Sequence, residues 1–117
     1  MHHPLTPDMR KGIEACQRCH NICLQTAIGH GLETGGSQVE AAHLRLMIDC
    51  AEICVACADF LLRGSHFHDQ ACQLCATICE ACGLACEQAG GMSDCVHACQ
   101  RCAENCRHIV ETMVVST

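Results

Sequence analysis

Cysteines make up 15 of the 117 residues, and they fall into four groups whose members lie three or four residues apart. The groups are Cys16, Cys19 and Cys23; Cys50, Cys54 and Cys57; Cys72, Cys75, Cys79, Cys82 and Cys86; and Cys95, Cys99, Cys102 and Cys106. Steps of three and four place every thiol of a group on one face of an α-helix. Thiolates bind soft metal ions, so four such faces predict a metal-binding interior.

The charge of the loaded state distinguishes between possible metals. Zinc prefers closed sites of four thiolates, each of which keeps two negative charges. Several such sites side by side in one core would be costly to desolvate. Cu(I) removes that charge at about one ion per thiolate, accepts two or three ligands and is selected by soft thiolate sites. The sequence therefore favours Cu(I), with multiple ions per chain and all fifteen cysteines as ligands.

Three alternatives stay open: a zinc-binding protein, an iron–sulfur protein and a thiol redox protein. Ferredoxin motifs wrap a loop around the cluster, whereas these groups lie on helices and no proline follows them. A redox protein needs an exposed cysteine of low pKa, and no cysteine here stands apart from the groups. A disulfide scaffold is disfavoured because the cysteine count is odd.

Glycines and capping residues divide the chain into the helices that must carry these thiols. Thr6 before Pro7 predicts the start of the first helix, and Gly29 and Gly31 predict its end. The predicted helices span residues 7–29, 38–63, 66–88 and 94–114. Their matched lengths predict an all-α fold, an antiparallel up-down-up-down four-helix bundle with a cysteine-lined core. Residues 1–117 are expected to form a single domain.

Charge and hydropathy exclude several partners. The formal net charge of −6 argues against nucleic acid, which requires a basic face. No apolar stretch is long enough to cross a bilayer, so no membrane partner is expected. The amino terminus lacks the apolar segment of a secretory signal, which predicts a cytoplasmic protein. In that compartment thiols stay reduced and available to metals.

Beyond the thiols, the helical faces continue with other residues that bind copper. His30 continues the face of the first helix, and His43 and Met47 precede the thiols of the second. Met92 precedes the thiols of the fourth helix. An antiparallel bundle brings these four residues to one end, so we predict that this end admits Cu(I), with His43 and then His30 as the leading ligands.

The opposite end of the bundle is expected to be a mostly apolar plug. The faces there carry Met9, Leu61, His68 and Met113. His66 and His68 flank a predicted loop, and both are expected to be exposed and not to bind metal.

Three segments carry a resemblance to a known family. They are Cys50-Ala51-Glu52-Ile53-Cys54, Cys72-Gln73-Leu74-Cys75-Ala76-Thr77-Ile78-Cys79-Glu80-Ala81-Cys82 and Cys99-Gln100-Arg101-Cys102-Ala103-Glu104-Asn105-Cys106. With these segments the chain resembles the bacterial copper storage proteins, and in particular their cytosolic subgroup, from about residue 7 onward. The resemblance implies a homotetramer of four-helix bundles that stores or detoxifies Cu(I) and is not an enzyme. Family members often carry a histidine-rich loop between the third and fourth helices, which residues 89–94 of this chain lack.

Overall fold

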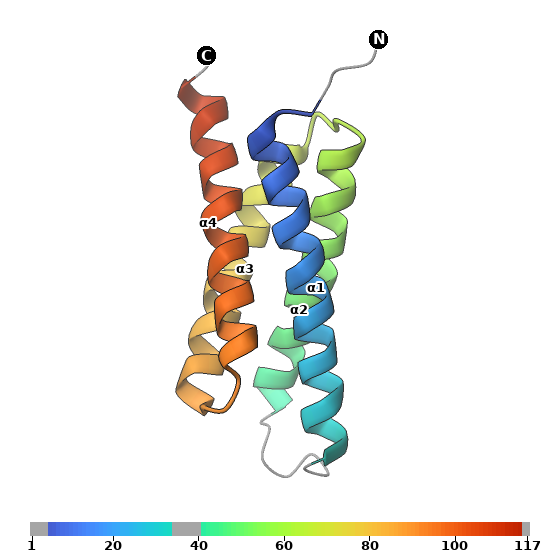
Figure 1. The fold of residues 1–117 in the computed structure, drawn as a ribbon, viewed down its shortest axis with the longest axis vertical. Coiled ribbons are helices and arrows are strands. Elements are labelled where there is room, and N and C mark those ends of the chain that lie inside the picture. Colours follow the sequence, from blue (N-terminus) through green and yellow to red (C-terminus); the bar gives the residue numbers. More distant parts are fainter. Residues whose placement is uncertain (1–4, 34–40, 116–117) are drawn as a thin grey trace.

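The computed structural model describes residues 5–33 and 41–115, and within these ranges it contains four α-helices and no strand. They are α1 (Pro7–Glu33), α2 (Ala41–Leu62), α3 (His68–Ala89) and α4 (Ser93–Val115). Consecutive helices run in opposite directions (Figure 1). The predicted all-α, up-down-up-down bundle is confirmed.

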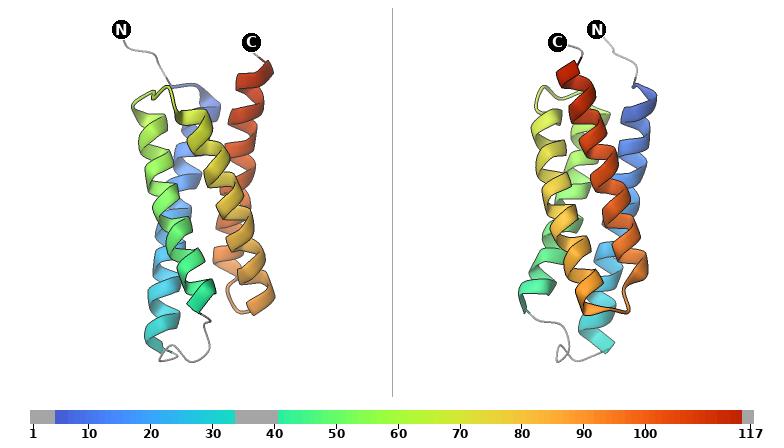
Figure 2. Two further views of the ribbon diagram at one scale, coloured as in Figure 1. Left: turned by 180° about the vertical axis from the view of Figure 1, so that it is seen from behind. Right: turned by 90° about the vertical axis from the view of Figure 1, so that its left-hand side faces the viewer.

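The helices pack around a common axis, each against two neighbours. The backbone of α1 lies next to α2 and α4, and that of α3 next to α2 and α4. Across the diagonal of the bundle, thiols meet: the Sγ of Cys50 on α2 lies 3.8 Å from that of Cys99 on α4. α1 begins and α4 ends at the same end of the bundle (Figure 2). All four helices therefore direct one face toward the same interior, which is the arrangement that the four cysteine groups require.

The first helix begins where the sequence predicts and ends later. Thr6 caps it, because its Oγ1 accepts a hydrogen bond from the backbone N–H of Met9 at 3.1 Å. The predicted end at residue 29 is wrong, because α1 continues to Glu33. A glycine inside a helix costs only about 1 kcal/mol relative to alanine, so Gly29 permits a helix end without enforcing one. The predicted start of the second helix at residue 38 lies outside the described residues.

Glycines with positive φ make the two described turns. Gly64 follows α2 with a φ of 62°, and Gly90 and Gly91 follow α3 with φ values of 78° and 74°. Such values are strained for residues with a side chain, which explains why both turns use glycine. α3 begins at His68 and not at residue 66, and its N-cap Phe67 makes no side-chain capping bond.

Cysteine replaces the usual large aliphatic residues in the core. All fifteen cysteine side chains are fully buried, and alanines fill much of the remaining interior. Gly83 faces α4, and a Cβ atom at this position would lie 3.2 Å from the Cβ atom of Cys99. Small side chains thus let the helices approach closely and bring the sulfurs together. Across the described helices, no segment combines the length and apolarity needed to cross a membrane.

Candidate metal centre

The structure brings all fifteen predicted cysteines into the interior of one bundle as free thiols. Contacts between Sγ atoms within and between the groups measure 3.2–3.9 Å. A disulfide would bring two sulfurs to about 2.05 Å, so these distances describe thiols in van der Waals or weak hydrogen-bond contact. The interior is a column of sulfur atoms along the bundle axis.

Sulfurs in this column form overlapping groups of four. In each group the Sγ atoms lie within 4.8 Å of one another. Five such groups are Cys16, Cys75, Cys102 and Cys106; Cys19, Cys50, Cys54 and Cys79; Cys19, Cys23, Cys50 and Cys99; Cys23, Cys82, Cys95 and Cys99; and Cys54, Cys75, Cys79 and Cys102. Eight of the twelve thiols in these five groups belong to two groups at once, although three of the groups have no member in common. Shared thiolates suit bridging between several monovalent ions better than isolated tetrahedral sites.

Many of the short contacts join different helices. Cys86 of α3 lies 3.2 Å from Cys95 of α4, and Cys23 of α1 lies 3.4 Å from the same sulfur. Contacts one turn apart on a single helix, such as Cys19–Cys23 at 3.8 Å, also occur. The spacing in the sequence predicts only the second kind, so the partners across the bundle become visible only in the fold.

One end of the column carries the predicted entry residues. The imidazole Nε2 of His43 lies 3.4 Å from the Sγ of Cys86, and Met47 and Met92 are buried at the same end. The backbone of His30 belongs to α1, but its side chain lies outside the described part of the chain. A cavity of about 340 Å³ opens beside Cys86 at the α3–α4 turn, and His97 also lines it.

The thiols at this end differ in acidity. Hydrogen bonds from neighbouring thiols, that of Cys23 first, lower the pKa of Cys95 to about 5. A hydrogen bond with Cys82 lowers the pKa of Cys86, but its bond to Cys95 and its burial outweigh this effect and raise the pKa to about 12. Cys95 is therefore the more acidic thiol of this pair, and Cys86 donates a hydrogen bond to it.

Thiols with a raised pKa and thiols with a lowered pKa occur together throughout the column. Hydrogen bonds among the thiols, with burial in addition, raise the pKa of nine cysteines: Cys16, Cys23, Cys54, Cys57, Cys72, Cys79, Cys86, Cys99 and Cys102. Hydrogen bonds accepted from such thiols lower the pKa of five others: Cys19, Cys50, Cys75, Cys95 and Cys106. A metal ion that binds any of the nine thiols with a raised pKa must therefore displace a proton.

Comparisons with known proteins agree with this architecture. The family model described as copper storage protein matches residues 6–111. The chain belongs to the copper storage protein family. No curated protein matches the chain. A crystal structure of a protein from Nitrosospira multiformis is 48% identical, with a TM-score of 0.84 over 90% of this chain and 96% of that one.

Another similar structure is that of a copper storage protein with bound metal. The Cu(I)-bound copper storage protein BsCsp3 is 32% identical to this chain, with a TM-score of 0.82 over 88% of this chain and 98% of that one. The resemblance noted in the sequence is thus confirmed at the level of the family.

The end of this copper storage fold that is opposite His43 is largely apolar, with one exception. Leu61, Ile13 and Ile109 are buried there, as an apolar plug requires, and the side chain of Met113 lies outside the described residues. His66 is exposed, but the prediction that His68 is also exposed is wrong, since only 9% of His68 is accessible. α3 begins at His68, and this start places the imidazole on the inward face of its first turn.

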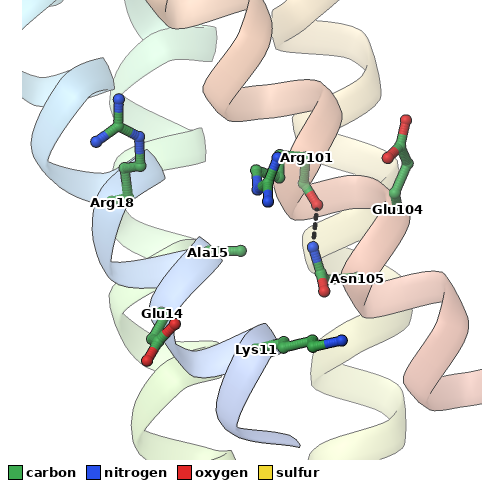
Figure 3. A pocket seen from close by; sticks show the side chains of 7 residues that line it. All are labelled: Lys11, Glu14, Ala15, Arg18, Arg101, Glu104 and Asn105. Carbon is green, nitrogen blue, oxygen red and sulfur yellow. Dashed lines mark hydrogen bonds between the residues drawn. The ribbon is translucent and has the colours of Figure 1, made fainter. Parts of the chain in front are cut away.

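Charged side chains lie outside the column. A groove of about 540 Å³ between α1 and α4 is lined by Lys11, Glu14, Ala15, Arg18, Arg101, Glu104 and Asn105 (Figure 3). Its lining contains neither thiol nor imidazole, and its charged groups are exposed. The groove is therefore a solvated surface and does not contribute to the metal centre.

Proposed function

We propose that this protein stores copper by binding many Cu(I) ions through the thiolates inside its bundle. One observation carries the proposal: fifteen free thiols form an uninterrupted column in which neighbouring four-sulfur groups share members. A column of shared thiolates can bind soft monovalent ions along almost its whole length. Copper ions are the cargo of this protein, and we assign it no catalytic role.

Charge supports Cu(I) over zinc as the cargo. Each thiol in the core gives up a proton when it binds metal, which leaves a negative charge away from water. One Cu(I) per thiolate neutralises the column, whereas zinc in sites of four thiolates leaves half of the thiolate charge uncompensated. The binding of Cu(I) to the related protein BsCsp3 agrees with this argument.

We also propose a cytoplasmic homotetramer in which residues 1–117 of each chain form a single domain. A reducing compartment would keep the thiols free, and all four helices contribute to one buried cluster. Leu74 and Leu84 on α3 and Ile28 on α1 are each more than half exposed, and such apolar side chains favour contact between copies. The net charge of −6 makes nucleic acid an unsuitable partner, and we propose no membrane partner.

Anaerobic titration of the reduced protein with Cu(I) tests the storage function. We expect uptake to continue to about one ion per thiol, because that ratio neutralises the column. Bound copper is counted by atomic absorption and thiols by a colorimetric assay on the unfolded protein. Saturation at three or four ions per chain would instead favour zinc-type sites, and a parallel zinc titration provides the comparison.

We further propose that Cu(I) enters beside His43. Its Nε2 is close to Cys86, which in turn donates a hydrogen bond to the more acidic Cys95, so an incoming ion meets an imidazole and then two thiols in sequence. Met47 and Met92 border the same end and offer thioether sulfurs, which are weaker and more exchangeable ligands. We propose His30 as a fourth ligand at this entry end.

Replacing His43 by leucine is expected to slow loading without changing capacity. If the imidazole lowers the entry barrier by about 1.4 kcal/mol, the initial rate of Cu(I) uptake falls roughly tenfold. Stopped-flow absorbance of the thiolate-to-copper charge-transfer band measures this rate. His66→Leu, an exposed position at the other end, is the matched control. Equal rates in the two variants would show that copper enters elsewhere.

A further inference from the structure

His68 is a buried imidazole with one bonded and one free nitrogen. Its Nδ1 lies 2.8 Å from the carbonyl oxygen of Ser65, and its Nε2 has no hydrogen-bond partner among the described residues. A carbonyl oxygen can only accept, so Nδ1 carries the hydrogen, and in the neutral imidazole Nε2 then holds the lone pair. An unpaired buried acceptor of this kind is unfavourable in the empty protein.

Thiols lie on the same face, one helical turn farther along α3. Cys72 follows His68 by four residues, and side chains four apart on a helix have Cβ atoms about 5–6 Å apart. The Sγ of Cys72 lies 3.7 Å from that of Cys57 on α2. Leu61, one turn beyond Cys57, is fully buried and helps to keep this end of the column dry.

We propose that His68 is a metal ligand that closes the column at the end opposite His43, where its Nε2 binds Cu(I) together with Cys57 and Cys72. Metal-binding histidines almost always donate their second N–H to a carbonyl or carboxylate, which fixes the tautomer, and the bond to Ser65 fulfils this condition. A neutral imidazole adds a third ligand without adding charge. The inference rests on the proposed storage of Cu(I) and extends it beyond the cysteines.

Nitrogen NMR of the wild-type protein tests this ligand directly. Long-range ¹H–¹⁵N spectra of the imidazole rings are recorded for the reduced empty protein and after anaerobic loading with Cu(I). We expect the His68 Nε2 resonance to move from the position of a free lone-pair nitrogen to that of a metal-bound nitrogen, while Nδ1 stays protonated. His68→Gln identifies the resonance, and exposed His66 is the internal reference, which should not move.

A matched pair of variants provides a second measurement. In competition with a Cu(I) chelator, His68→Leu should lose one ion at a chelator concentration about tenfold below that needed for the wild type, whereas His66→Leu should not. A wild-type protein that loads fully while Nε2 of His68 stays unchanged would overturn this inference and leave copper storage intact. A wild-type protein that takes up no Cu(I) would overturn the storage function itself.

Discussion

Loading the reduced protein with Cu(I) is expected to raise its thermal unfolding temperature by more than about 20 °C. Each ion bound only by the folded state adds about 4 kcal/mol when its free concentration is a thousand times its Kd. For a chain of this size, 1 kcal/mol corresponds to roughly 3–5 °C, so five such ions already exceed that rise. Differential scanning calorimetry under anaerobic conditions measures the change.

The stabilisation should depend on the shared thiols. Cys19 and Cys50 each belong to two of the overlapping four-sulfur groups, so serine at both positions removes ligands from the centre of the column. We expect Cu(I) loading to raise the thermal unfolding temperature of this double variant less than that of the wild type. Addition of a chelator to the loaded wild type should return its unfolding temperature to that of the empty protein. A loaded protein that melts within a few degrees of the empty one would mean that the ions bind outside the folded core.

Alkaline pH is expected to unfold the empty protein within about one unit above pH 9. Nine thiols have a pKa raised by their neighbours and by burial, among them Cys86 at about 12. In the unfolded chain the same thiols ionise near pH 8.5. Above that pH the unfolded state binds fewer protons than the folded state, so stability falls as pH rises.

The number of thiols with a raised pKa sets how steeply the free energy of unfolding falls as pH rises. Each one contributes up to about 1.4 kcal/mol per pH unit, and together the nine approach 12 kcal/mol per unit, comparable to the total stability of a typical domain. Thiols with a lowered pKa, such as Cys95, are ionised in both states above pH 9 and do not oppose this slope. Their contribution is instead lost on acidification, as pH falls through the folded pKa.

Circular dichroism during an anaerobic pH titration measures the alkaline transition. The Cu(I)-loaded protein is the control, because its thiols have already lost their protons and it should stay helical over the same range. An empty protein that keeps its helices up to pH 11 would show that its buried thiols ionise without unfolding the bundle.

The spacing of the cysteines was sufficient to predict most of the fold. Steps of three and four require a helix if the thiols are to share a face, and Gly64, Gly90 and Gly91 interrupt the chain where helices end. Gly29 carried the same signal but lies inside α1, because a glycine tolerates both a helix interior and a helix end. The existence of the helices was thus predictable, while some of their boundaries depended on context.

The sequence by itself determined that the cysteines face the interior and that a soft, monovalent metal suits them, because periodicity and ligand chemistry are local properties. Only the tertiary structure decided which sulfurs meet across the bundle, for example that Cys86 contacts Cys95 and His43. It also decided that His68 is buried. These contacts depend on how neighbouring helices are positioned along the bundle axis and on where α3 begins. Close packing of the whole bundle sets both, and no single segment encodes them.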